Sequence, residues 1–141
     1  MGVLTLEALR DAIRASKGAD DDTRRMELAF AELVLRLDVC ATENGDGVIE
    51  TVYENPALDR PVPSYLDPIA GPGTLFAAAR ERWPECCLQA GHDDGPAKGC
   101  RAGFWPDHVI AHYVDVHHPF LAHALALAMV EAAIAEAGAN R

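Results

Sequence analysis

The chain has 141 residues, 50% of them hydrophobic, and its 22 acidic and 12 basic side chains give a formal charge of −10. This length and apolar content allow one sizeable hydrophobic core and exclude a chain that is disordered throughout. The acidic balance disfavours a nucleic-acid-binding surface, because such surfaces gain affinity when Lys and Arg displace counterions from phosphates.

The first residues carry no secretion signal, since the sequence Met1-Gly-Val-Leu-Thr-Leu-Glu lacks a basic region. No run approaches the 18 apolar residues of a membrane span. We therefore expect a cytoplasmic protein with no membrane partner. In that compartment the four cysteines, which are Cys40, Cys86, Cys87 and Cys100, are expected to be reduced thiols.

Two amphipathic helices are predicted in residues 1–37, where they form a helical hairpin. The first apolar stripe is Leu6, Leu9 and Ile13, and the second is Met26, Phe30, Leu33 and Leu37. Apolar residues at these spacings share one face of a helix. Thr5 is the expected N-cap of the first helix, and Gly18 is placed to end it.

Residues 38–73 are predicted to form an acidic, proline-rich connection. The sequence Asn44-Gly45-Asp46-Gly47 indicates a turn, and one strand is expected after it at residues 48–53. Five prolines between positions 56 and 72 rule out a long helix. Arg60 is the only base among residues 38–70, where the acids are Asp38, Glu43, Asp46, Glu50, Glu54, Asp59 and Asp67.

Residues 74–141 are predicted to form an α-β-β-β-α unit. A helix at 74–83, with Thr74 as its N-cap, precedes alternating strands at 86–90, 100–105 and 109–116. The final helix, at 120–137, carries no charge until Glu131 and must be largely buried. The predicted single domain is therefore α+β, with a three-stranded antiparallel sheet packed on the terminal helix.

Residues 63–135 resemble small uncharacterised proteins of proteobacterial prophages and phage-like elements. The similar stretches are Pro63-Ser64-Tyr65-Leu66-Asp67, Leu75-Phe76-Ala77-Ala78-Ala79, Trp83-Pro84, Cys100-Arg101-Ala102-Gly103-Phe104 and His118-Pro119-Phe120-Leu121-Ala122-His123-Ala124-Leu125. This resemblance covers about half the chain and implies a mobile-element setting, but no activity.

The α-β-β-β-α order also resembles the double-stranded-RNA-binding fold. In that fold, lysines at the start of the last helix contact phosphates across a groove. The matching stretch here, residues 117–123, contains neither Lys nor Arg. The resemblance therefore implies a shared element order without RNA binding.

A metal site or a catalytic thiol would have to come from the histidines and cysteines. Cys86, Cys87, His92 and Cys100 surround one predicted hairpin, but they lack the paired C-x₂-C spacing of a zinc site. His92 or His112 has no recognisable motif through which to activate Cys100. We therefore expect no cofactor, no metal and no enzymatic activity. The cluster His117, His118 and His123 fits either a partner contact or a strand end.

The function that this pattern favours is inhibition of a host protein complex in a mobile-element setting. In its most specific form the protein is an anti-CRISPR whose carboxylates replace phosphates in a basic nucleic-acid channel. The expected partner-binding residues are Glu43, Asp46, Glu50, Glu54, Asp93, Asp94, Trp105, Asp107 and Tyr113. Trp83 and Trp105 each fit either an interface anchor or the core.

The sequence leaves three alternatives open. The first is an accessory factor of phage assembly, and the second is a nucleic-acid-binding module that uses the nearly neutral N-terminal helices. The third is that the acidic residues serve only to keep a small protein soluble. The sequence does not fix the oligomeric state.

Overall fold

The structure is a computed structural model, and it describes residues 5–18, 23–37, 39–43, 49–53, 62–92 and 99–139. Its elements in chain order are α1 (Leu6–Ala15), α2 (Thr23–Leu33), β1 (Val39–Glu43), β2 (Ile49–Tyr53), α3 (Gly71–Arg82), β3 (Cys87–His92), β4 (Cys100–Trp105), the 3₁₀ turn η1 (Ile110–His112), β5 (Val114–His118) and α4 (Leu121–Ala139). The predicted α+β class, with a three-stranded antiparallel sheet against the last helix, is confirmed.

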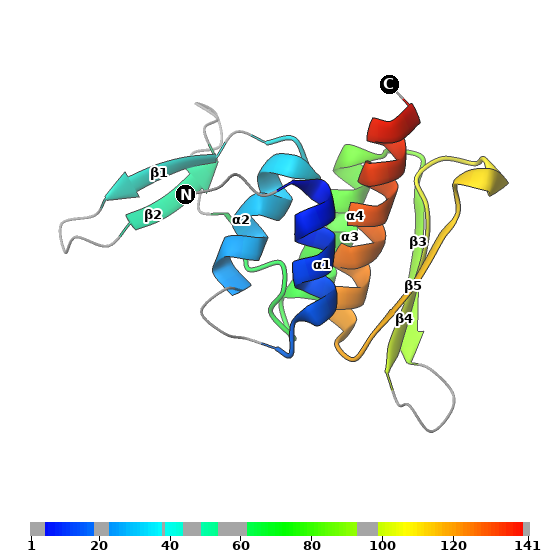
Figure 1. The fold of residues 1–141 in the computed structure, drawn as a ribbon, viewed down its shortest axis with the longest axis horizontal. Helices are drawn as coiled ribbons and strands as arrows, with labels where there is room; N and C mark the ends of the chain where they lie inside the picture. Colours follow the sequence, from blue (N-terminus) through cyan, green and yellow to red (C-terminus); the bar gives the residue numbers. More distant parts are fainter. Residues whose placement is uncertain are drawn as a thin grey trace.

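Helix α4 lies at the centre of the molecule. The helices α1 and α3 pack against it, and the β3–β4–β5 sheet covers another side (Figure 1). Every residue from Ala122 to Val130 is buried. A helix that is enclosed on all sides has no solvent face on which to place charges, which explains the uncharged run in the sequence.

By length and composition alone, α4 is also apolar enough to cross a membrane, with a mean hydropathy of 1.4. It is the one such helix within the described ranges, and 61% of its most apolar stretch is buried inside the protein. The core helix of a folded domain has these same properties, so α4 gives only weak evidence on membrane association.

The inner face of the sheet rests on α4. Strand β4 pairs with both neighbours in antiparallel register, and Phe104 and Ala102 face the core from its middle. Trp83 is 7% exposed and packs edge-on against Phe104, with ring centroids 5.1 Å apart. The indole N–H of Trp83 donates to Glu136 on α4 (3.0 Å). Trp83 is therefore a core residue and not an interface anchor.

The N-terminal helices form as expected at their start and differ at their end. Thr5 caps α1, because its hydroxyl accepts a hydrogen bond from the Ala8 N–H (3.1 Å). The predicted stripe of α2 is wrong at Leu37, which is 38% exposed. The helix ends at Leu33, and the positive φ of Arg36 (56°) turns the chain away before Leu37 would face the core.

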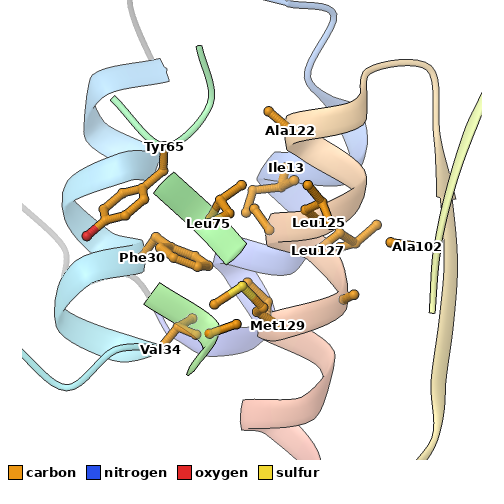
Figure 2. Packing of buried hydrophobic residues seen from close by; sticks show 14 of the residues in the cluster. Ile13, Phe30, Val34, Tyr65, Leu75, Ala102, Ala122, Leu125, Leu127 and Met129 are labelled. Atoms are coloured by element: carbon orange, nitrogen blue, oxygen red, sulfur yellow. The ribbon is translucent and has the colours of Figure 1, made fainter. Parts of the chain in front are cut away.

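Beneath α2, the core includes a segment that precedes α3. Figure 2 shows Phe30 beside Tyr65, whose ring centroids are 5.1 Å apart. Glu27, which is 4% exposed, accepts a hydrogen bond from the Leu66 N–H (2.9 Å). Arg24 donates to the Val62 carbonyl (2.7 Å). The apolar stripe of α2 does not predict a buried acid, and the role of Glu27 is to satisfy the backbone of this non-helical segment.

Helix α3 begins earlier than the sequence predicts. The Asp67 Oδ2 atom accepts the backbone N–H groups of Ile69 (3.0 Å) and Ala70 (2.7 Å), so Asp67 caps the helical turn that leads into α3. The prediction of Thr74 as N-cap is wrong, because Thr74 lies within the helix and its hydroxyl donates to the Ala70 carbonyl (2.9 Å). The carboxylate cap displaces the boundary by a full turn.

The connection at residues 38–73 contains two strands where one is predicted. β1 and β2 pair in antiparallel register from Val39↔Tyr53 to Glu43↔Ile49. The predicted turn at residues 44–47 falls between these strands but lies outside the described residues. In Figure 1 this hairpin and the three-stranded sheet lie at opposite ends of the long axis, with the helices between them.

Candidate functional site

The segment between β4 and β5 extends beyond the sheet and exposes apolar side chains. We call residues 105–113, from the last residue of β4 to the residue before β5, the prong (yellow at the upper right of Figure 1). Sequence alternation predicts a strand from residue 109, but β5 begins only at Val114 and η1 occupies Ile110–His112. Ile110 is 85% exposed and Val109 is 47% exposed. The expectation that Ile110 and His112 belong to a strand is therefore wrong.

Asp107 holds the prong in this conformation. Its Oδ1 atom accepts the Val109 N–H (3.0 Å), and its Oδ2 atom lies 2.8 Å from His112 Nδ1. The hydrogen bond with His112 and the backbone N–H of Val109 lower the pKa of Asp107, which therefore stays ionised. An aspartate that bonds nearby backbone N–H groups in this way competes with strand pairing, and this is the physical reason why the strand starts late.

Two aromatic rings lie together at the base of the prong. The ring centroids of Trp105 and Tyr113 are 4.2 Å apart, with 30° between the ring planes. Tyr113 lies over Gly103 of β4, where a Cβ atom would stand 2.7 Å from the phenol oxygen. The absence of a side chain at Gly103 is thus what lets Tyr113 lie across the strand and meet Trp105.

An ion pair borders these rings on the solvent face of the sheet. Arg101 donates to Asp115 through two parallel hydrogen bonds of 2.8 and 2.7 Å. These bonds raise the pKa of Arg101, with a smaller contribution from Tyr113, and they lower the pKa of Asp115. A bidentate pair of this kind fixes both side chains in one geometry. The site therefore combines the exposed apolar residues of the prong, the paired rings at its base and the ion pair beside them.

The structure brings together three of the nine predicted binding residues, namely Trp105, Asp107 and Tyr113. Strands β1 and β2 carry Glu43 and Glu50 at the opposite end of the molecule from the sheet (Figure 1). The other four predicted carboxylates, which are Asp46, Glu54, Asp93 and Asp94, lie outside the described residues. The residues that the sequence did not single out are Ile110 and Val109, whose exposure depends on the Asp107 turn.

The candidate zinc and thiol residues fall at two separate places. The β3–β4 register pairs His92 with Cys100 but Cys87 with Trp105, five residues away along β3. That separation is about 17 Å in an extended strand. Cys100 Sγ lies 3.8 Å from His92 Nδ1, and burial raises the pKa of the Cys86 thiol, which opposes its ionisation. Within the described ranges, no three His, Cys, Asp or Glu side chains are placed to hold a metal.

Two of the C-terminal histidines are structural. His118 and His123 are 3% and 2% exposed, and their rings stack with centroids 4.8 Å apart. His118 Nε2 donates to the Ile13 carbonyl (3.0 Å), and His123 Nε2 lies 3.1 Å from the Ser16 hydroxyl. His118 thus ties the end of α1 to the end of β5, and His123 ties it to the start of α4. His117, by contrast, faces solvent.

Comparisons of the chain with protein-family models, with curated proteins and with solved structures found no match.

Proposed function

We propose that the protein is a non-enzymatic protein-binding module and that the prong is its anchor. The observation that carries this proposal is Ile110, which is 85% exposed in a segment that hydrogen bonds of Asp107 hold in place. An apolar side chain in that position contributes nothing to the core. A rigid apolar tip loses little conformational entropy on docking, which is the condition under which one residue contributes much of the binding energy.

The partner that suits this surface is a protein with an apolar pocket and a basic rim. The chain has a formal charge of −10, and the ionised Asp107 lies within the prong itself. Trp105 and Tyr113 add a ring face that attracts Arg or Lys side chains. Attraction between an acidic protein and a basic surface speeds association and weakens as salt concentration rises.

The narrower form of the proposal is inhibition of a host complex, as in an anti-CRISPR. Its support is the resemblance to prophage proteins and the acidic run at residues 38–70, where the carboxylates would replace phosphates. The cytoplasmic location and the lack of a membrane partner stay predictions.

The experiment is capture of partners from the native host, followed by affinity measurements on the identified partner over a range of salt concentrations. Ile110→Ser should weaken binding by about 30-fold, the effect of removing an interface anchor worth about 2 kcal/mol. Ile69→Ser is the matched control, because Ile69 is also an exposed isoleucine, at 92%, outside the prong. This control should bind like the parent protein.

Three outcomes would overturn the proposal. The first is an identified partner whose affinity is insensitive to Ile110→Ser. The second is an affinity that does not fall as the salt concentration rises. The third is direct binding of duplex DNA or RNA by the isolated protein at physiological salt, which would support the nucleic-acid-binding alternative instead.

A further inference from the structure

Two buried histidines lie where the end of α1, the end of β5 and the start of α4 meet. His118 is the last residue of β5, and His123 lies in the first turn of α4. Their rings stack almost in parallel, with 14° between the ring planes, and both side chains are buried. We call these two residues the histidine pair. Buried imidazoles must satisfy their ring nitrogens, so the partners of this pair determine which protonation state fits.

Both ring nitrogens of His118 already have backbone partners. Nε2 donates to the Ile13 carbonyl in the last turn of α1 (3.0 Å), and Nδ1 accepts the N–H of Phe120, the residue before α4 (3.0 Å). These partners fix the neutral tautomer that has its hydrogen on Nε2. A proton added to Nδ1 would point at the Phe120 N–H, so His118 becomes charged only if this hydrogen bond breaks.

His123 is bound to the residue that ends α1. The Ser16 hydroxyl donates to the Gly18 carbonyl (3.2 Å), so its oxygen is left to accept the Nε2–H of His123 (3.1 Å). The ring centroids of the pair are 4.8 Å apart. Two imidazolium charges at that separation repel each other, and they do so more strongly inside a protein than in water. The closed arrangement therefore does not accommodate a charge on both rings.

The side chains around His118 do not compensate for a positive charge. On β4 the titratable group that faces it is the thiol of Cys100, its register partner, and beyond this lies His92 of β3, 3.8 Å from the thiol. The charged residues at the end of α1, Arg14 and Lys17, are exposed bases. Among the residues that the structure describes, no carboxylate lies within ion-pair distance of His118, and burial lowers its pKa.

The remaining charges on the neighbouring elements are directed elsewhere. On α4, Glu131 faces Arg10 and Arg14 of α1, and on β5, Asp115 pairs with Arg101 on the solvent face of the sheet. The two helix termini act in opposite directions, because the end of α1 favours a cation and the start of α4 disfavours one. Burial outweighs the favourable terminus, since the pKa of the β5 ring in the pair is lowered overall.

Helix α1 is placed so that it can leave the rest of the fold. It is the first described helix of the chain, and it packs on α4 and α2 (Figure 1). Its buried side chains are Leu9 and Ile13, which hold it in place at neutral pH. The contacts within the sheet and between α3 and α4 do not pass through α1, so they can outlast its departure.

We propose that the histidine pair is an acid-sensitive latch on α1. Proton binding breaks the contacts of the pair with this helix, and α1 then leaves while the sheet and the α3–α4 contact persist. In the open form His118 regains its ordinary pKa of 6.5, so the open form binds the proton more tightly than the closed form. Above pH 6.5 acidity does not change the opening. Below it, the equilibrium constant for opening rises by at most about tenfold per pH unit, until the pH reaches the lower pKa of the closed form.

The test is hydrogen exchange of the full chain at pH 7.5 and at pH 5, expressed as protection factors so that the intrinsic effect of pH on exchange is removed. The amides of α1 should be less protected than those of β4 at both pH values, because α1 opens without the sheet. Protection of α1 should fall severalfold at the lower pH. The proposal is overturned if α1 protection is the same at both pH values. It is also overturned if α1 and β4 are equally protected, since α1 would then open only with the whole fold.

Two matched variants assign the pH dependence to the latch. His118→Gln retains a donor and an acceptor but does not titrate, so α1 protection should become nearly independent of pH. His117→Gln makes the same substitution at the neighbouring, exposed residue of β5, and it should behave like the parent chain. A fall in protection that persists in His118→Gln, or that disappears in His117→Gln, overturns the proposal.

A measurement on the parent chain keeps the test independent of whether His118→Gln folds. The ring of His118, followed by NMR in the folded protein, should titrate below pH 6.5. A ring that titrates at or above this pH overturns the proposal, because the closed form would then bind the proton at least as tightly as the open form.

Discussion

Replacing Gly71 with alanine should destabilise the protein, although alanine is the better helix former. Gly71 is buried at the first position of α3, and a Cβ atom there would stand 2.3 Å from the Tyr65 carbonyl oxygen. It would also stand 3.1 Å from the Ala122 Cβ atom on α4. Cβ contacts under 3.0 Å essentially never occur, so the carbonyl or the helix must move by at least 0.7 Å, the difference between 3.0 and 2.3 Å.

Neither neighbour can move freely. Tyr65 is buried against Phe30, and the next residue, Leu66, is held by Glu27. We expect a loss of about 3 kcal/mol in the free energy of unfolding, as for other overpacked core sites. The melting temperature of a chain of this size should then fall by about 10 °C.

A matched control lies two residues further along the same helix. Gly73→Ala adds its methyl group to open space, so it should stabilise α3 by about 0.5–1 kcal/mol through helix propensity. Urea unfolding followed by tryptophan fluorescence measures both variants. The steric argument is refuted if Gly71→Ala is as stable as the parent, or if both variants shift stability in the same direction.

Three further predictions concern other contacts. Burial lowers the pKa of His118 below its usual 6.5, so the contribution of His118 to stability is present above pH 6.5 and is lost as the pH falls through the folded-state pKa. The urea midpoint should therefore drop between pH 7.5 and pH 5, and His118→Gln should reduce this drop. An unchanged drop would contradict the prediction. Gly103→Ala should displace Tyr113 from the strand, which near-ultraviolet circular dichroism would detect as a changed aromatic signal. Glu27→Ala should cost about 1–3 kcal/mol in urea unfolding, because it leaves the Leu66 N–H buried without its acceptor; a smaller cost would mean that water replaces the carboxylate.

The parts of the fold that could be predicted are those whose signal is a long apolar pattern. The uncharged run beginning at Phe120 indicates a buried helix, and the alternation of Cys100, Ala102 and Phe104 indicates a strand with one inner face. The structure has both. Thr5 is an N-cap in both because its signal is local. Periodicity and local capping depend only on residues close in sequence, so they can be recognised without knowing which elements pack against the segment.

The missed parts depend on single side chains that act on the backbone at short range. Asp107 turns an alternating sequence into an exposed prong, and Asp67 starts α3 before the expected cap. Glu27 is buried because its carboxylate accepts the backbone N–H of residue 66. The sequence pattern of α2 does not predict this contact, because the donor lies in a distant segment. The pairing of Trp105 with Tyr113 likewise depends on the β4–β5 register and on the bare backbone of Gly103.

The central position of α4 has a consequence for how the protein is made. Every described element that packs against this helix precedes it along the chain, and α1 is separated from it by more than one hundred residues. On the ribosome, the apolar sides of α1, α3 and the sheet therefore stay uncovered until α4 has been synthesised. Folding of this core therefore requires α4 to have been synthesised, and until then the nascent chain is a natural client for chaperones that bind exposed apolar segments.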